Sequence, residues 1–189
     1  MPTDNGLQTL FLDALKDLYY AENQILKALP KMAEAAATEE VEAAFEKHLS
    51  ETEAQVERLK QVFEILGEEP KGKECPAIDG IIAEGEEIIE QHEGTAAIDA
   101  GLVAAAQAVE HYEIARYGTL VAWAGVLELS DAADILQATL AEEEATDEAL
   151  TELADGGVNE AALGESDVEE DDEADSESEL ESEDDEAAR

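Results

Sequence analysis

Apolar residues recur at helical spacing over four long stretches of the chain. Stripes that repeat every three to four residues are typical of amphipathic helices that bury one face. The four predicted helices begin after residues 3–5, at about Glu39, at about Asp99 and at Ser130, and they end near Ala36, Leu66, Leu127 and Ala154. The pattern therefore predicts an all-α protein built on four long helices.

The connections between these helices differ greatly in length. Residues 37–40 and 127–130 are short enough for tight hairpins, and each carries capping residues. Residues 67–98 are far too long for a hairpin, and they contain a short amphipathic segment around residues 78–91. We expect a crossover that runs along the bundle and carries a short fifth helix.

From Asp155 onward the helical pattern stops. The segment consists of Glu, Asp, Ser, Ala and Gly with very few apolar residues. That composition is typical of a disordered acidic tail, because too little apolar surface is present to offset chain ordering. We therefore divide the chain into a helical bundle at residues 1–154 and an acidic tail at residues 155–189. The tail could raise solubility or recruit basic partners.

The charge balance is strongly acidic. The chain has 51 acidic and 10 basic residues, a net charge of −41, and residues 1–154 alone keep 34 acidic and nine basic residues, a net charge of −25. Such a surface repels nucleic acid and anionic lipid, which excludes both as partners. Acidic excess with few lysines suits a high-salt cytoplasm, where screening weakens self-repulsion. The alternative is an ordinary acidic protein with an acidic tail.

Cysteine content and hydropathy limit the compartment. Cys75 is the only cysteine, so no intramolecular disulfide or thiolate cluster can form. The sequence has no basic start followed by an apolar run and no apolar stretch of membrane length. We expect a soluble cytoplasmic protein.

Each predicted helix places acidic residues on or beside its buried face. Glu110 and Glu113 lie one turn apart within an apolar stripe, where carboxylates are costly unless something compensates them. His48 lies at the edge of its face, where a boundary histidine with a local hydrogen bond is the simpler interpretation. The candidate metal ligands are Glu22, His48, Glu51, Glu110, Glu113, Glu143 and Asp147.

Hairpin register predicts that these acids meet. In an antiparallel hairpin, two residues lie at equal depth when their midpoint falls in the turn. The midpoint of Glu22 and Glu51 falls between residues 36 and 37, beside the first turn. The second turn, near residue 128, is the midpoint of two further pairs, Glu113 with Glu143 and Glu110 with Asp147. The acids of each hairpin should therefore be level with one another.

The sequence offers three ways to compensate the buried acids. No Lys or Arg shares the buried faces, although Arg116 could reach the rim. The acids could be protonated, or they could accept hydrogen bonds from Tyr117 and Thr52. Oxygen-rich ligands around one or two divalent cations would offset the charge directly, and they suit iron or manganese. We favour the metal site because so many acids converge.

Four segments resemble the YciE/YciF family of ferritin-like stress proteins. The segments are Leu15–Glu22, His48–Thr52, Glu110–Ile114 with Tyr117–Leu120, and Leu140–Asp147. They occur in the family's order, and the resemblance covers about residues 7–154. It implies a ferritin-like four-helix bundle, a fold that places a Glu from each of two helices and Glu-x-x-His from the other two around two metal ions.

The resemblance implies a stress-response protein with two divalent metal ions, iron or manganese, and ferroxidase or peroxide-consuming activity. Three departures stand out, the first being that the third predicted helix carries a second carboxylate, Glu110 with Glu113, where the general pattern has one. His48 and Glu51 read His-x-x-Glu, the reverse of the general motif, and Glu143 with Asp147 includes no histidine. The site would therefore be rich in oxygen ligands, with Tyr20, Tyr112 or Tyr117 near it. The alternative is a non-catalytic bundle that acts through protein interactions, with a structural metal or none. A homodimer is the expected assembly.

Overall fold

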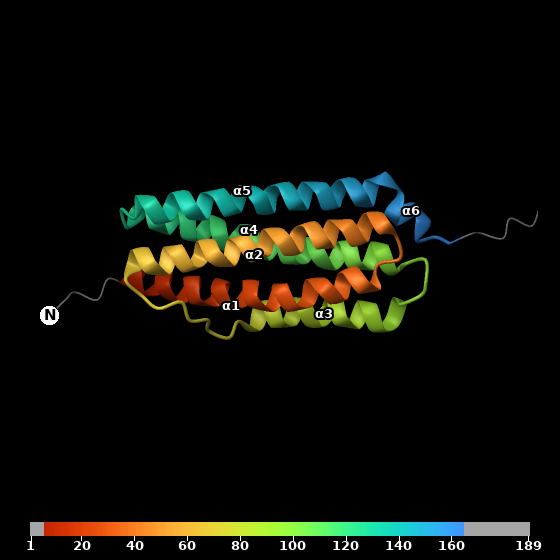
Figure 1. The fold of residues 1–189 in the computed structure, drawn as a ribbon, viewed down its shortest axis with the longest axis horizontal. Helices are drawn as coiled ribbons and strands as arrows, with labels where there is room; N and C mark the ends of the chain where they lie inside the picture. Colours follow the sequence, from red (N-terminus) through yellow and green to blue (C-terminus); the bar gives the residue numbers. More distant parts are fainter. Residues whose placement is uncertain (1–5, 165–189) are drawn as a thin grey trace, which may run out of the picture.

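The computed structural model describes residues 6–164, and these residues form a helical bundle (Figure 1). The helices are α1 (Gly6–Ala35), α2 (Glu39–Leu66), α3 (Pro76–His92), α4 (Ile98–Val126) and α5 (Ser130–Leu153), followed by a π-helical turn η1 (Ala154–Val158) and the short α6 (Asn159–Ala161). The predicted all-α class, the four long helices and the short helix in the crossover are confirmed. None of the helices in the described part of the chain is long and apolar enough to cross a membrane.

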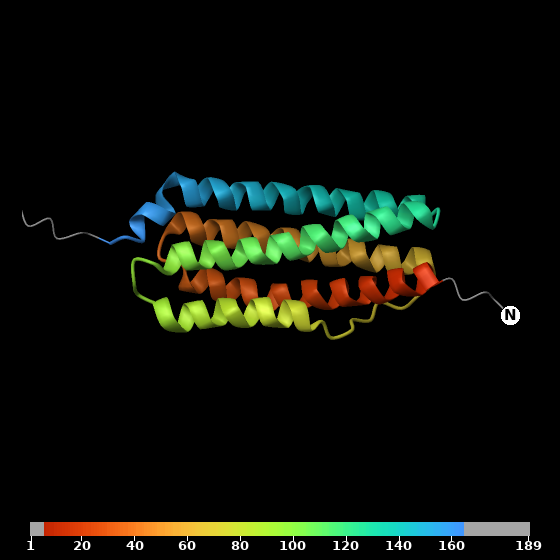
Figure 2. The same cartoon turned by 180° about the vertical axis from the view of Figure 1, so that it is seen from behind.

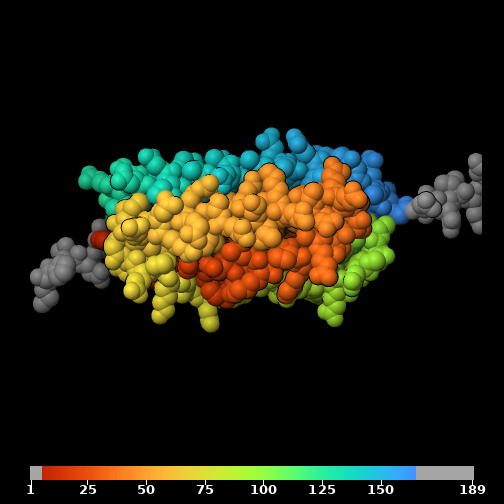
Figure 3. All heavy atoms as spheres, viewed as in Figure 1, coloured from red at the N-terminus to blue at the C-terminus, as the bar shows by residue number. Residues whose placement is uncertain are grey.

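The four long helices form two antiparallel hairpins, α1 with α2 and α4 with α5. α2 and α4 run in the same direction, so residues 67–75 and α3 must return along the bundle (Figures 1 and 2). α3 packs against α4 and α1, and it lies outside the four-helix arrangement. Figure 3 shows side chains of α2 and α5 meeting along one face. This arrangement is the crossover that the length of residues 67–98 predicts.

The ends of α2 follow from local capping. Thr38 accepts a hydrogen bond from the backbone N–H of Val41 through its side chain, which satisfies a free donor at the start of the helix. Gly67 has a φ of 69°, and its N–H bonds to the carbonyl of Glu64 at the other end. Glycine adopts this left-handed conformation at little cost, which ends the helix at Leu66. Both ends match the prediction.

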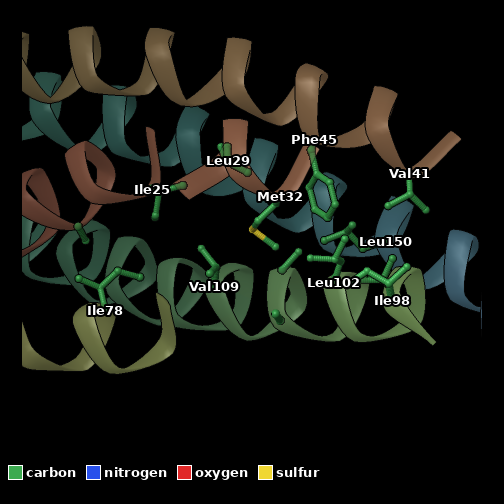
Figure 4. Close-up of a cluster of buried hydrophobic side chains, with 14 of the residues drawn as sticks. Ile25, Leu29, Met32, Val41, Phe45, Ile78, Ile98, Leu102, Val109 and Leu150 are labelled. Carbon is green, nitrogen blue, oxygen red and sulfur yellow. The ribbon is translucent and has the colours of Figure 1, made fainter. Parts of the chain in front are cut away.

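The apolar core consists of two clusters. One extends from Ala21 to Met32 along α1 and includes Phe45, Leu102 and Leu150 (Figure 4). The other contains Phe11, Leu18, Phe63, Tyr117 and Leu136, among others. Between them, at the middle of the long helices, the buried side chains are polar. The polar layer lies where the hairpin register predicts it.

The helical structure extends beyond the expected boundary at Asp155. η1 and α6 carry the helix to Ala161, with a bend at Gly157, which has a φ of 127°. Val158 packs against the first core cluster, an apolar contact that composition alone does not reveal. The remainder of the predicted acidic tail, residues 165–189, lies outside the described residues.

Asp99 holds the α1–α2 turn against α4. Its carboxylate accepts hydrogen bonds from the N–H of Ala37 at 2.7 Å, from the N–H of Thr38 at 3.1 Å and from the Thr38 hydroxyl at 2.7 Å. Asp99 is buried, so its removal leaves these donors unsatisfied away from water.

We expect Asp99→Ala to lower the free energy of unfolding by about 2–4 kcal/mol, because hydrogen bonds to a buried charged group are lost. Urea denaturation measures this change. Asp134→Ala, at an exposed aspartate on α5, is the control and should change stability by no more than about 0.5 kcal/mol. Equal effects of the two substitutions would contradict the role of Asp99.

Candidate metal centre

Five acidic or histidine side chains meet in the polar layer at the middle of the bundle. α1 supplies Glu22, α2 supplies His48, α4 supplies Glu110 and Glu113, and α5 supplies Glu143. The four glutamates are 0% exposed and His48 is 3% exposed. Such complete burial makes any uncompensated charge in the layer very costly.

Four of these side chains form a compact cluster. His48, Glu110, Glu113 and Glu143 each place one ligand atom so that all four atoms lie within 4.8 Å of one another. His48 Nδ1 lies 3.3 Å from Glu110 Oε1. His48 comes from α2 and Glu143 from α5, whereas Glu110 and Glu113 lie one turn apart on α4. The cluster therefore depends on how these three helices pack.

The carboxylate oxygens in this layer lack hydrogen-bond donors. Among the described residues, no group donates a hydrogen bond to either oxygen of Glu110, Glu113 or Glu143, or to Oε2 of Glu22. Buried polar atoms in folded proteins are almost always paired. Seven unsatisfied oxygens in one layer therefore indicate that protons or a cation must balance them.

One hydrogen bond within the layer is well defined. The Tyr117 hydroxyl, which is fully buried, donates to Oε1 of Glu22. The carboxyl group of Glu113 lies beside that of Glu22, and the charge of Glu22 raises the pKa of Glu113 after the larger effect of burial. Tyr117 thus orients Glu22, as one of the sequence-based alternatives proposed. Thr52 does not contribute, because its hydroxyl donates to the backbone carbonyl of His48.

Burial shifts the pKa values of the layer strongly. Desolvation raises the pKa of Glu22 and of Glu110 to about 8, and it raises the pKa of Glu113 and of Glu143 well above the usual range. Desolvation also lowers the pKa of His48 to about 4. Without a cation, the acids are largely protonated at neutral pH and the imidazole is neutral, which is its metal-binding form.

Glu51 and Asp147 lie at the rim rather than in the compact cluster. The side chain of Glu51 is 27% exposed and lies 2.8 Å from Lys47 Nζ. The side chain of Asp147 is 23% exposed and lies 3.2 Å from His111 Nε2. Both carboxylates still raise the pKa of Glu110 electrostatically, after the larger contribution of burial. On α2 it is His48, three residues before Glu51, that points inward.

His111 lies on the surface, since its side chain is 70% exposed. The hydroxyls of Tyr112 and Tyr20 have partners outside the buried layer. The Tyr112 hydroxyl lies 3.2 Å from Cys75 Sγ, and the Tyr20 hydroxyl donates to Asp79. Of the three tyrosines considered from the sequence, Tyr117 alone contacts a glutamate of the layer.

Sequence reasoning missed an ion pair beside the site. The Arg58 guanidinium binds both oxygens of Glu142 at 2.6 Å, and Gln55 donates to the same carboxylate at 3.3 Å. Hydrogen bonds from Arg58 lower the pKa of Glu142, so this rim carboxylate is ionised while its neighbour Glu143 is not. The pair joins α2 to α5, which do not form a hairpin with one another. Hairpin register compares only the two helices of one hairpin, so it could not predict this contact.

The residues present fit a metal centre. His48, Glu110, Glu113 and Glu143 could hold a metal ion, and Glu22 lies beside Glu113. Carboxylate and imidazole donors suit first-row divalent metals such as iron and manganese. If all four buried glutamates ionise, their total charge of −4 is balanced by the +4 of two divalent cations. The unsatisfied oxygens would then become ligand atoms.

Comparison with known proteins identifies the family. The family described as "Domain of unknown function (DUF892)" matches residues 6–163, which is nearly all of the described chain. The chain belongs to this family. Protein YciF of Escherichia coli (strain K12) is 46% identical over 157 residues, which covers 82% of this chain and 95% of YciF. The resemblance to the YciE/YciF family is thus confirmed.

Solved structures agree with the fold. The crystal structure of the E. coli stress protein YciF has a TM-score of 0.78 at 46% identity, covering 84% of this chain and 99% of that one. YcfI from Rhodopseudomonas palustris has a TM-score of 0.76 at 48% identity, covering 80% and 97%. A protein from Xanthomonas campestris has a TM-score of 0.63 at 25% identity, covering 83% and 96%. The bundle with its crossover is therefore a shared architecture.

Proposed function

We propose that the protein is a ferritin-like di-metal carboxylate protein, holding two iron or manganese ions, with ferroxidase or peroxide-consuming activity in a stress response. One observation carries the proposal: four buried glutamates and a neutral His48 converge in a layer where seven carboxylate oxygens receive no hydrogen bond from residues 6–164. Its relative YciF is named as a stress protein, which supports the physiological setting.

The metal ions would supply redox chemistry, and the protein would supply binding and orientation. His48, Glu110, Glu113, Glu143 and Glu22 are the ligands that the layer offers. Tyr117 fixes one oxygen of Glu22 and leaves the other free to bind. Two bound ferrous ions would supply the two electrons that, with two protons, reduce dioxygen to hydrogen peroxide. Because burial raises the pKa of Glu22 and Glu110 to about 8, these carboxyl groups would release protons when a cation binds.

Metal analysis and a ferrous oxidation assay test the proposal directly. Protein purified without a His-tag should bind about two divalent ions per chain, and it should oxidise Fe(II) faster than buffer does. Glu22→Ala combined with Glu113→Ala should reduce oxidation to the buffer rate, because two of the four charge-balancing carboxylates are lost. Stopped-flow absorbance measures the rate, and elemental analysis measures the stoichiometry.

Glu144→Ala is the matched control, since Glu144 is the exposed neighbour of Glu143. This variant should keep the metal content and the oxidation rate of the original protein. The proposal is wrong if the protein binds no divalent metal, or if the Glu22→Ala/Glu113→Ala variant oxidises Fe(II) at the original rate.

Complete burial favours a second candidate, a structural metal in a non-catalytic bundle. With exposures of 0–3%, the candidate ligands face the packed interior and not the solvent. In that case metal removal would lower the melting temperature, and Fe(II) oxidation would stay at the buffer rate. The two candidates therefore differ in the oxidation assay and agree in the metal analysis.

A further inference from the structure

We propose that an apolar passage between α1, α3 and α4 admits small apolar molecules of the size of dioxygen to the buried carboxylate layer. The role of this passage as an oxidant route rests on the proposed function, because it needs a metal centre at its inner end. The passage itself is a property of the packed side chains and can be tested without metal.

The passage is a cavity of about 30 Å³ in the first core cluster. A single water molecule needs at least ~10–15 Å³, so the space is large enough for a diatomic molecule. Figure 4 shows Met32 of α1 and Val109 of α4 projecting toward one another in this region. Nearly all of its walls are aliphatic, and the main contributors are Ile25, Leu29, Met32, Ile82, Ile89 and Val109.

His48 lies at the inner end of the passage. It is the one side chain that both lines the cavity and belongs to the compact cluster in the described residues. Its Nδ1 lies 3.3 Å from Glu110 Oε1, so a molecule in contact with the imidazole is one side chain away from the carboxylates. The passage thus leads to the candidate ligands and does not end blindly in the core.

The outer end opens in the groove between α1 and α3. Lys31 and Glu86 line the cavity and also two wider surface hollows on either side of it. Lys31 Nζ lies 2.6 Å from Glu86 Oε1, and this ion pair spans the mouth. Both side chains are more than half exposed, so the pair is weak and can open readily.

The lining selects what can pass. An aliphatic channel offers no hydrogen bonds, so cations would lose their hydration without replacement and water would be disfavoured. Dioxygen carries no charge and needs no such replacement. A second cavity of about 40 Å³ lies between α2 and α5 on the other side of His48. Lys47, Glu51 and Thr146 are among the residues that line it. The two sides of His48 therefore differ in polarity, and the apolar side is the one through which dioxygen would pass.

Xenon binding to the metal-free protein tests the passage without any activity. Xenon occupies apolar cavities, so a crystal under xenon pressure should show the atom between Met32 and Val109. Ala28→Leu with Gly85→Ala should reduce its occupancy at least fivefold. Ala28 is half-buried, and a Cβ at Gly85 would meet Ala105 Cβ at 3.7 Å, an ordinary contact. The filled variant should therefore fold.

Ala33→Leu is the matched control. Ala33 is also half-buried on α1, and it does not line the passage. This variant should bind xenon as the original protein does. No xenon at this site in the original protein, or undiminished xenon in a folded Ala28→Leu/Gly85→Ala variant, would overturn the passage.

The oxidation assay then tests the route. With Fe(II) loaded, the filled variant should react with dioxygen at least threefold more slowly, and Ala33→Leu should react at the original rate. An unchanged rate in the filled variant would overturn the route even if the metal binds. Xenon binding in a protein that takes up no metal would instead support the passage as a gas-binding cavity and overturn the proposed function.

Discussion

The metal-free protein is expected to lose about 7 kcal/mol of unfolding free energy as the pH rises from 6.5 to 8. The cause is the buried carboxyl layer, in which burial raises the pKa of Glu22 and Glu110 to about 8 and that of Glu113 and Glu143 well above its usual range. In the unfolded chain these groups ionise near pH 4.5. Each must therefore take up a proton on folding, which costs more as protons become scarce.

His48 acts in the opposite direction, and its pH window is different. Burial lowers its pKa to about 4, so its folded form is neutral whereas the unfolded imidazole is protonated below about 6.5. The stability that depends on neutral His48 is complete above pH 6.5 and is lost as the pH falls toward 4. Between pH 6.5 and 8 the carboxyl effect acts without opposition from His48.

Denaturant unfolding in the presence of a chelator, at constant ionic strength, measures this slope. Adding Mn(II), which is not oxidised by air under these conditions, should stabilise the protein by about 4 kcal/mol at a thousandfold excess over its dissociation constant. This gain should grow with pH, because the metal displaces protons from the ligands. A free energy of unfolding that is constant from pH 6.5 to 8 without metal would contradict the buried, protonated layer.

Local signals explain why so much of the fold could be predicted. Thr38 and Gly67 end their helices through hydrogen bonds and backbone geometry within a few residues, so sequence is sufficient there. Hairpin register is also local, because a short turn fixes which residues are level. That is why Glu113 and Glu143 were expected at one depth, and both lie in the buried layer.

Helix rotation and non-hairpin packing explain what could not be predicted. His48 and Glu51 are three residues apart, about 60° around the helix, and apolar periodicity does not resolve which one faces inward. Asp147 is four residues from Glu143, and an inward Glu143 leaves it at the rim. The Arg58–Glu142 pair depends on how α2 meets α5, which the two hairpins leave undetermined.

The same reasoning explains why composition misjudged the end of the helical bundle. Residues 155–161 are mostly small or acidic, so composition predicted a disordered tail. Val158, a single apolar residue, packs against the core and the chain bends at Gly157 to bring it there. One apolar contact on an already formed helix can extend order, since the helix needs no new nucleus.

Glu143→Gln is expected to change stability in opposite directions with and without metal. In the metal-free protein at pH 8, the amide removes the need to take up a proton on folding, so the variant should be more stable by on the order of 3 kcal/mol. At pH 5 the unfolded carboxyl is partly protonated and the difference should shrink to below about 1 kcal/mol. The amide keeps the size of the side chain, so packing changes little.

With metal, the same substitution removes a charged ligand from the compact cluster. The affinity for Mn(II) should fall at least a hundredfold, and the variant should become the less stable of the two proteins at a Mn(II) concentration that saturates the original one. Glu144→Gln, one residue along on the exposed face, should match the original protein in both conditions. A structural role for Glu143 in a bundle that binds no metal would give a difference of the same sign with and without Mn(II). The change of sign, measured by denaturant unfolding at pH 8, therefore separates a metal ligand from a buried acid that merely packs.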